Sequence, residues 1–582
     1  MLEKNNELDG YDKITVAPHY RDTREKLIKD NDLVDEKYQK YIPILARRLN
    51  KIHGVEHDEI FWKKCFSLSL LRYITFYYDL FQRCEDHFDS AIHDCTVVSE
   101  DSYYTPKDFE DHRDFFQTTA FGQEQIFSIY IHLFYPDSYK AISKTFIWPT
   151  VPSTKKNIFL KIKDKLSRIT INKVITRLLS LVYKMRQPVV IITGSYFSAK
   201  NMNKVLMLGK GKIQQVTISK FIDKNSVKGS SEREYLAKSE DNFDKFDRLF
   251  FQSIKSSFPS DFIENFNSIH NTFSVQLQRY KNVRYVINEN WIGNQDYAIF
   301  VAIAQQKGVK HIYNEHNFLQ HHFLKNNLKY LYPLVDQFIT LGWSKIGMPA
   351  HVIKGASLYE WKENKNHNKN YDILYIEGPP AVKTPEFSSS YGDSESYNAE
   401  NSLIFKKTFF SLLSNDIIQR VVYRPYPLNK YSTTFVKPYM DCYDQMEALK
   451  DHLHNVNFID DYRYSSKEMI GKSKIVVVDY LSTSYVESLI GSTPTIFFWI
   501  EKNYFLNDLN LNFYQDLIDV GICHTNPERA ANFLAIICKN PEGWWNDEKV
   551  ERARLKFLSD NFGNEKDMID YYLKCISDNN SS

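Results

Sequence analysis

The segment 474–496, KIVVVDYLSTSYVESLIGSTPTI, constrains the fold more than any other part of this chain. It opens with the β-branched apolar run Ile475–Val478, continues through the hydroxyl cluster Ser482–Ser484, and ends in a second apolar run that starts at Pro494. This order predicts a strand, a tight loop, a helix and a second strand. Near-continuous apolar strands are typical of parallel sheets, because helices cover both sheet faces.

Similar patterns recur in two series along the chain, separated by the polar segment Lys362–Lys369. Strands are expected in the first series from Pro188 to Gly194 and at Ile213–Ser219, Val283–Asn288, Lys310–Asn314 and Gln337–Leu341, with a helix at Tyr297–Gln306. In the second series we expect strands at Tyr371–Ile376, Val421–Tyr423, Val456–Ile459 and Ile475–Val478, a polar loop at Ser388–Ala399, and helices at Asn401–Leu413, Glu528–Cys538 and Asp547–Phe562. The alternation predicts two Rossmann-like α/β domains, at 187–362 and 370–582.

Residues 1–186 carry a different pattern and are expected to form a helical N-terminal extension. Apolar residues recur at helical spacing in Asp35–Asn50, Glu59–Phe81 and Asp111–Phe134. In Lys155–Arg186, ten charged residues are basic and one is acidic. A basic amphipathic helix can lie on an anionic membrane surface. Apolar helix stripes more often face a protein core, and that interpretation is favoured here.

Composition narrows the functional class. The net charge of the 582-residue chain is +2, so no overall positive field draws it to nucleic acid. The seven cysteines include no CxxC pair, which favours a reducing compartment over a disulfide framework or a zinc site. The N-terminus lacks an apolar signal core, and no apolar run reaches the roughly 20 residues of a membrane span. We expect a cytoplasmic protein, at the inner face of the cytoplasmic membrane if 155–186 contacts lipid.

Ligand sites in parallel α/β sheets lie beyond the carboxyl ends of the strands. In the first series those ends carry Gly194 and Ser195, then Asn288 and Glu289. Two tandem α/β domains suit an enzyme that brings a nucleotide-activated donor to an acceptor, and these four residues are the candidates on the acceptor side.

The next strand end carries Glu315 and His316, the candidate catalytic residues. Histidine is the commonest general base near neutral pH, although a lone histidine is often structural. His316 lies close to the adjacent pair His321–His322, but this spacing is not that of a zinc-binding helix, and we expect no metal.

The second series offers candidate donor-binding residues at its own strand ends. Arg424 follows a strand, where a guanidinium can bind a phosphate through two parallel hydrogen bonds. Ser482, Thr483 and Ser484 stand at a helix start, where unpaired amides and the helix dipole favour an anion. The alternative is that a hydroxyl merely caps the helix. Glu487, one turn later, could accept a hydrogen bond from a sugar hydroxyl.

Further blocks of the sequence resemble a known family. They are Arg424–Pro427 (RPYP, with Tyr426), Val478–Trp499 (with Tyr480), Asp516–Phe533, Trp544–Trp545 ahead of Ala553–Leu558, Leu334–Trp343 and His53–Lys64. On these blocks the chain resembles GT-B-like transferases encoded in bacterial surface-polysaccharide and nonulosonic-acid gene clusters, distantly similar to capsule Kdo transferases and to teichoic acid glycerophosphotransferases. Where that family has a glycine-rich QHGG-like turn, this chain has Glu315–Phe318, which keeps the histidine and lacks the glycines.

The resemblance implies a GT-B fold with two facing Rossmann-like domains. The second domain would bind the donor, with Tyr426 and Tyr480 beside Arg424 and the serines, and the first domain would bind the acceptor. We therefore expect a metal-independent glycosyltransferase that moves a sugar from a nucleotide-activated donor, of which CMP-linked is one candidate, to a glycan or lipid-linked acceptor of a surface polysaccharide such as capsule or O-antigen. The alternatives are a glycerophosphotransferase-type polymer enzyme on the same fold and a non-catalytic scaffold of envelope assembly.

Overall fold

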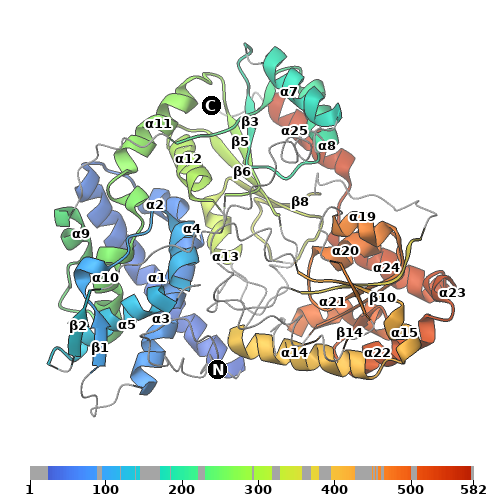
Figure 1. Ribbon diagram of the computed structural model, residues 1–582. Helices are drawn as coiled ribbons and strands as arrows, with labels where there is room; N and C mark the ends of the chain where they lie inside the picture. The colour runs from blue at the N-terminus through green and yellow to red at the C-terminus, as the bar shows by residue number, and fades with distance from the viewer. Residues whose placement is uncertain are drawn as a thin grey trace, which may run out of the picture.

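A computed structural model shows the fold and describes residues 24–87, 95–117, 120–137, 139–143, 171–183, 185–220, 230–291, 294–316, 328–345, 347–356, 369–378, 395–426, 449, 453, 456–459, 465–499 and 508–577. These residues form a helical N-terminal region and two α/β domains, each built on a six-stranded parallel sheet (Figure 1). A helical N-terminal region followed along the chain by two Rossmann-like domains confirms the predicted GT-B-like α/β fold class.

Helices dominate the N-terminal region, as the apolar spacing predicts. Its elements are α1 (Arg24–His53), α2 (Glu59–Phe66), α3 (Ser69–His87), β1 (Cys95–Val98), η1 (Glu100–Ser102), α4 (Phe109–His112), η2 (Arg113–Gln117), α5 (Ala120–Phe134), β2 (Tyr139–Ile142) and α7 (Ile171–Tyr183). The short strands β1 and β2 pair in parallel and were not expected. The helix expected over Glu59–Phe81 is divided at Ser67, whose φ of 48° does not continue a right-handed helix.

The first α/β domain has the strand order β4-β3-β5-β6-β7-β8, all parallel. Its elements are β3 (Val190–Thr193), α8 (Ala199–Gly209), β4 (Ile213–Gln215), α9 (Ser230–Ala237), α10 (Lys245–Ser257), η3 (Ser260–Phe262), α11 (Phe266–Gln278), β5 (Tyr285–Asn288), α12 (Gln295–Gln306), β6 (Lys310–Asn314), α13 (Leu328–Leu331), η5 (Tyr332–Leu334), β7 (Gln337–Thr340) and β8 (Val352–Lys354). The chain reverses its direction of winding between β3 and β5, so this edge of the sheet is a topological switch point.

The second α/β domain has the order β11-β10-β9-β12-β13-β14, also all parallel. Its elements are β9 (Tyr371–Ile376), α14 (Glu395–Ser411), α15 (Asn415–Gln419), β10 (Val421–Arg424), β11 (Asn457–Phe458), α19 (Ser466–Gly471), β12 (Ser473–Val478), α20 (Thr483–Ile490), β13 (Thr495–Phe498), α21 (Asp508–Asp519), β14 (Cys523–His524), α22 (Pro527–Ile537), α23 (Pro541–Trp545), α24 (Glu548–Asn561) and α25 (Glu565–Ser577). This is the doubly wound 3-2-1-4-5-6 order, whose switch point lies between β9 and β12. Helix α14 begins within the polar loop expected at Ser388–Ala399, so that prediction was wrong for its last five residues.

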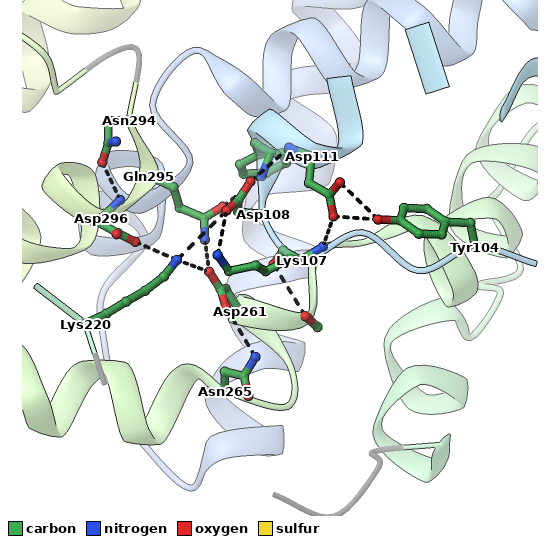
Figure 2. Close-up of polar contacts among 12 residues, drawn as sticks. Tyr104, Lys107, Asp108, Asp111, Lys220, Asp261, Asn265, Asn294, Gln295 and Asp296 are labelled. Carbon is green, nitrogen blue, oxygen red and sulfur yellow. Dashed lines mark hydrogen bonds and ion pairs between the residues drawn. The ribbon is translucent and has the colours of Figure 1, made fainter. Parts of the chain in front are cut away.

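The N-terminal region and the first α/β domain share one hydrophobic core. Side chains of α1, α2 and α3 pack with α10, α11, α12 and the buried face of β5. A polar network joins the same parts (Figure 2). Lys220 forms ion pairs with Asp108 of the N-terminal region at 3.9 Å and with Asp261 at 2.5 Å, and Phe109 N donates to Gln295 Oε1 at 3.1 Å. The helical extension is therefore fixed to η3 and to the start of α12.

The last helix, α25, leaves the second domain and completes the core of the first. Met568, Ile569 and Tyr572 pack with residues of β3, β5 and α8, although the sequence placed all of 370–582 in the second domain. The crossing is close, because a Cβ on Gly563 would lie 1.8 Å from Gly355 O. Gly342 also forms an antiparallel bridge with Phe562. The crossover joins the two domains at this edge.

The core-facing interpretation of the basic segment is wrong for most of the apolar side chains in its described half, although Leu179 of α7 does pack against the core of the first domain. Ile171, Leu178, Leu181 and Val182 are more than half exposed. Within the described residues, no helix is long and apolar enough to cross a membrane.

Candidate functional site

The carboxyl ends of β10, β9 and β12 lie side by side in the second domain. Arg424 at the end of β10 pairs in register with Ile376 of β9, and Ile376 pairs with Val478 of β12. Helix α20 begins five residues after Val478. Arg424 and the serine cluster, which are far apart in sequence, therefore meet at one edge of one sheet.

They also lie on the same face of that sheet. Val422 packs in the cluster that contains Tyr485 and Val486 of α20, whereas Tyr423 packs in the cluster on the opposite face. Because successive strand residues point to opposite faces, Arg424 lies on the α20 side together with Val422. The Arg424 side chain is buried.

The start of α20 is capped by its own serine. Ser482 is the N-cap residue, and its hydroxyl accepts a hydrogen bond from Ser484 N at 3.1 Å. This is the capping interpretation that the sequence left open, and it occupies one of the amides that an anion could use. Ser482 and Ser484 are buried, Thr483 is exposed, and Glu487 is half-buried.

Two tyrosines predicted to bind the donor border this edge. Tyr426 N donates to Glu377 Oε2 at 3.1 Å, which fixes the chain after β10. The Tyr480 ring packs on Gly378, where an added Cβ would lie 2.8 Å from the tyrosine Cβ and Cγ. Burial raises the pKa of Tyr480 to about 12, and the hydroxyls of Ser482 and Ser484 lower it in part.

A buried ion cluster at the switch point was missed by the sequence analysis. Lys406 of α14 lies 2.9 Å from Glu377 Oε1 and 3.5 Å from Asp479 Oδ2. Asp479 also accepts hydrogen bonds from Tyr375 OH at 2.8 Å and from Gly378 N. One lysine thus holds two carboxylates, which directly follow β9 and β12, on the face opposite Arg424.

Charge balance within the cluster is incomplete. Burial raises the pKa of Asp479, and the Lys406 charge offsets only part of that rise. Burial lowers the pKa of Lys406, but Glu377 and Asp479 more than reverse this, so its pKa is raised. Glu377 and Asp479 could have been predicted by the pattern that was used for Arg424, because each carboxylate directly follows an apolar run. Lys406 carried a weaker signal, since it stands among aromatic residues on the apolar side of its helix.

In the first domain, Gly194 and Asn288 are held together at the switch point. Gly194 has a φ of +56°, and an added Cβ would lie 2.8 Å from Asn288 Nδ2 and from the Tyr297 ring. Asn288 Nδ2 donates to Thr193 O at 2.9 Å, while Asn288 Oδ1 is buried without a partner among the described residues. Ser195 is half-buried in the loop that follows.

Glu289 is the most perturbed of the predicted acceptor-side residues. Its carboxylate is buried and accepts a hydrogen bond from Tyr196 N. Burial raises the pKa of Glu289 to about 7, although this hydrogen bond lowers it. The Tyr196 ring stacks on His316 with centroids 3.8 Å apart. More than a third of the His316 surface is open to solvent, and partial desolvation of its ring lowers its pKa, so the imidazole is neutral at pH 7.

Glu315 faces a different part of the domain from His316. Its Oε2 accepts hydrogen bonds from Trp343 Nε1 at 2.5 Å and Leu341 N at 3.2 Å, beyond the end of β7. Burial raises the pKa of Glu315 to about 8, while the Trp343 hydrogen bond lowers it. These contacts show that Glu315 holds the segment after β7 in place. Its catalytic role stays a prediction.

Comparison with known proteins identifies the family. A family model described as LIC12162 family transferase matches residues 2–576. The chain belongs to the LIC12162 family of transferases. No curated protein matches this LIC12162 transferase.

Several solved structures are similar to this chain at low identity. The wall teichoic acid polymerase TagF is 13% identical over 72% of this chain and 96% of its own, with a TM-score of 0.32. UDP-GlcNAc 2-epimerase from Methanocaldococcus jannaschii is 12% identical over 67% of this chain and 99% of its own, with a TM-score of 0.37. A UDP-glucose:anthocyanidin 3-O-glucosyltransferase, solved with UDP, is 11% identical over 68% of this chain and 100% of its own, with a TM-score of 0.33.

The segment after β7 of the LIC12162 transferase packs against its second domain. Leu341, which follows β7 of the first sheet, packs in the same hydrophobic cluster as Val422 and Tyr485 of the second domain. The backbone of this segment makes its contacts at the end of α24: Gly563 N donates to Leu341 O at 2.9 Å, and Gly342 bridges with Phe562.

Metal binding was predicted to be absent. The part of the chain that the structure describes has no group of three or more His, Cys, Asp and Glu residues arranged to hold a metal ion. His321 and His322 lie outside the described residues. Metal independence therefore stays a prediction for this transferase.

Proposed function

We propose that this transferase moves a sugar from a nucleotide-activated donor to a hydroxyl of a surface-polysaccharide acceptor. The supporting observation is that Arg424 and the start of α20 share one edge and one face of the second sheet. A cationic guanidinium beside a helix N-terminus favours a phosphate group.

In this proposal the sugar–phosphate bond breaks and the acceptor oxygen forms the new glycosidic bond. The second domain binds the donor: Arg424 and the amides at the start of α20 stabilise the charge on the leaving phosphate, and Glu487 accepts a hydrogen bond from a donor hydroxyl. This arrangement needs no metal, so chelation with EDTA should leave turnover unchanged.

The acceptor proton passes to a group on the first domain. His316 is neutral at pH 7 and more than a third of the residue is exposed, which suits a general base. Tyr196 joins it to Glu289, through the stacked ring on one side and the backbone amide on the other. Glu289 has a pKa of about 7, so it is a second group that can exchange a proton near neutral pH.

Calorimetric titration with donor nucleotides tests the donor assignment. Arg424→Ala is expected to weaken donor binding by at least about tenfold, since a charge-assisted pair contributes roughly 1.5–3 kcal/mol. The matched control is Arg420→Ala at the opposite end of β10, where Arg420 Nε pairs with Asp372 at 3.1 Å on the surface. Equal donor affinity in the two variants would remove Arg424 from the site.

The choice of donor separates the alternatives. CMP-linked and UDP-linked sugars test glycosyl transfer, and CDP-linked glycerol tests glycerophosphate transfer. A scaffold of envelope assembly binds none of them, so the absence of any thermal shift with all three donor classes would contradict both enzymatic functions.

A further inference from the structure

An exposed apolar stripe runs the length of α7, the outermost helix beside the first sheet. Its members recur at helical spacing on one side of the helix and just beyond it: Ile171, Val174, Leu178, Leu181, Val182 and Met185. Ile171 is 80% exposed and Met185 is 91% exposed. Contiguous apolar surface of this kind marks an interaction site more often than scattered exposed residues do.

The stripe is not the side by which α7 is attached to the protein. Thr176 Oγ1 donates to Asn203 Oδ1 of α8 at 2.6 Å, and Asn203 Nδ2 donates to Asn172 O at 2.9 Å. Leu179 packs against the hydrophobic core that also contains α25. Figure 1 shows α7 beside α8 and α25, at the end of the first domain away from the N-terminal helices. The attached side and the exposed stripe are therefore different faces of one anchored helix.

Basic side chains accompany this stripe on α7 and α8. The sequence contains no Asp or Glu between Asp164 and Asp223. Arg177 is exposed on α7 itself. On α8 the exposed side chains include Lys200, Lys204, Met207 and Leu208, which again combine cationic and apolar groups. An apolar face on a segment that carries cationic and no acidic side chains complements an anionic, partly apolar surface.

We propose that the exposed faces of α7 and α8 dock this protein on an anionic lipid bilayer. The apolar stripe enters the boundary between head groups and acyl chains, while Arg177, Lys200 and Lys204 contact the anionic head groups. Docking of two copies through this face would bring like charges together, which disfavours self-association. Helix α8 follows Gly194 at the carboxyl end of β3, so docking would hold the acceptor-side loops near the membrane; this last point alone rests on the proposed function.

Vesicle flotation with the full chain tests the docking face. We expect binding to phosphatidylcholine vesicles that contain phosphatidylserine, weaker binding to phosphatidylcholine alone, and a decrease with salt. Leu178→Ser/Leu181→Ser should weaken binding by at least about tenfold, because burial of one leucine contributes roughly 1.5–3 kcal/mol. Lys200→Glu/Lys204→Glu should also weaken it by at least about tenfold, since each cation near the surface contributes about 1 kcal/mol.

A matched control removes exposed apolar side chains from the second domain. Ile536 and Leu555 are 65% and 51% exposed on α22 and α24, and Ile536→Ser/Leu555→Ser should leave flotation unchanged. Absence of binding to anionic vesicles, or equal binding by the control and the α7 variant, would overturn the proposal. So would a dimer that the α7 variant dissociates. A large drop in melting temperature for the α7 variant would also overturn it, because another part of the chain would then cover the stripe.

Discussion

Replacement of Glu289 by glutamine is expected to stabilise the protein at alkaline pH and to leave its stability unchanged at acidic pH. Glutamine has nearly the shape of the protonated carboxyl group and can still accept the hydrogen bond from Tyr196 N. The substitution therefore removes the ionisation of Glu289 while it keeps the packing around this buried position.

The direction follows from the proton balance between the folded and unfolded chains. The pKa of Glu289 is about 7 in the folded protein and 4.5 in its reference state, because burial disfavours the charged form. Between these values the unfolded chain releases the proton while the folded chain keeps it, so the free energy of unfolding falls as pH rises. The fall begins near pH 4.5 and is complete just above pH 7.

Its size follows from the same two values. A shift of about 2.5 pKa units corresponds to about 3 kcal/mol, since one unit is about 1.4 kcal/mol. Wild type and Glu289→Gln should thus be equally stable at pH 4.5 or below, and above pH 7.5 the variant should be more stable by about 3 kcal/mol. At roughly 2–4 °C per kcal/mol for a domain of this size, the melting temperatures should differ by about 6–12 °C.

Thermal unfolding across this pH range measures the difference directly. Glu551, which is exposed on α24, provides the matched control, and Glu551→Gln should show no pH-dependent difference from wild type. A constant difference between Glu289→Gln and wild type at all pH values would refute the argument, because Glu289 would then have the same pKa in the folded and unfolded chains.

Three further substitutions test other parts of the site. Lys406→Met leaves Glu377 and Asp479 buried together and should lower the free energy of unfolding by about 3–5 kcal/mol in urea titrations. Ser482→Ala removes the N-cap of α20 and should lower it by about 1 kcal/mol in the same titrations. Gly194→Ala combines a positive φ with close contacts and should lower it by more than about 1 kcal/mol, measured by thermal unfolding.

Neighbouring residues provide controls for these three variants. Lys407→Met changes a half-buried lysine next to Lys406, and Thr483→Ala changes an exposed residue next to the cap. Gly308 has a φ of +78° but no atom within 4 Å of an added Cβ, so Gly308→Ala measures backbone strain alone. If any control were as destabilising as its partner, the contact assigned to that partner would not be the cause.

The strands of the fold could be predicted from the sequence wherever apolar runs were long. The strands Lys310–Asn314 and Tyr371–Ile376 were predicted with their observed bounds, because each is bounded by polar or turn-forming residues. The two-residue and three-residue strands β14 and β8 were not predicted. Strands β11 and β4 are equally short, but they lie within the longer predicted strands Val456–Ile459 and Ile213–Ser219. The pairing of β1 with β2 depends on contacts between distant segments, which local patterns do not record.

The candidate site could be predicted only in part, because it too depends on contacts between distant segments. A residue that follows an apolar run can be assigned to the carboxyl edge of a sheet, and this placed Arg424 and Glu289 at strand ends, as observed. Side chains that contact these residues from a helix or from another strand end cannot be assigned in this way. Lys406 reaches the second switch point from a helix, and the Tyr196 ring reaches His316 across two strands. Successive residues of a strand point to opposite faces of the sheet. This rule, applied to β9, β10 and β12, would have predicted Arg424 on one face and Glu377 and Asp479 on the other.

The return of α25 to the first domain has a consequence for biosynthesis. Met568, Ile569, Tyr572 and Cys575 complete a core whose other buried members precede residue 357, so that core stays open while the second domain is translated. Roughly 200 residues separate β8 from α25, which corresponds to about 10–40 s at typical elongation rates. During that interval the nascent chain exposes the apolar surface of α8 and β3 that α25 later covers, and this is when a ribosome-associated chaperone would be needed most.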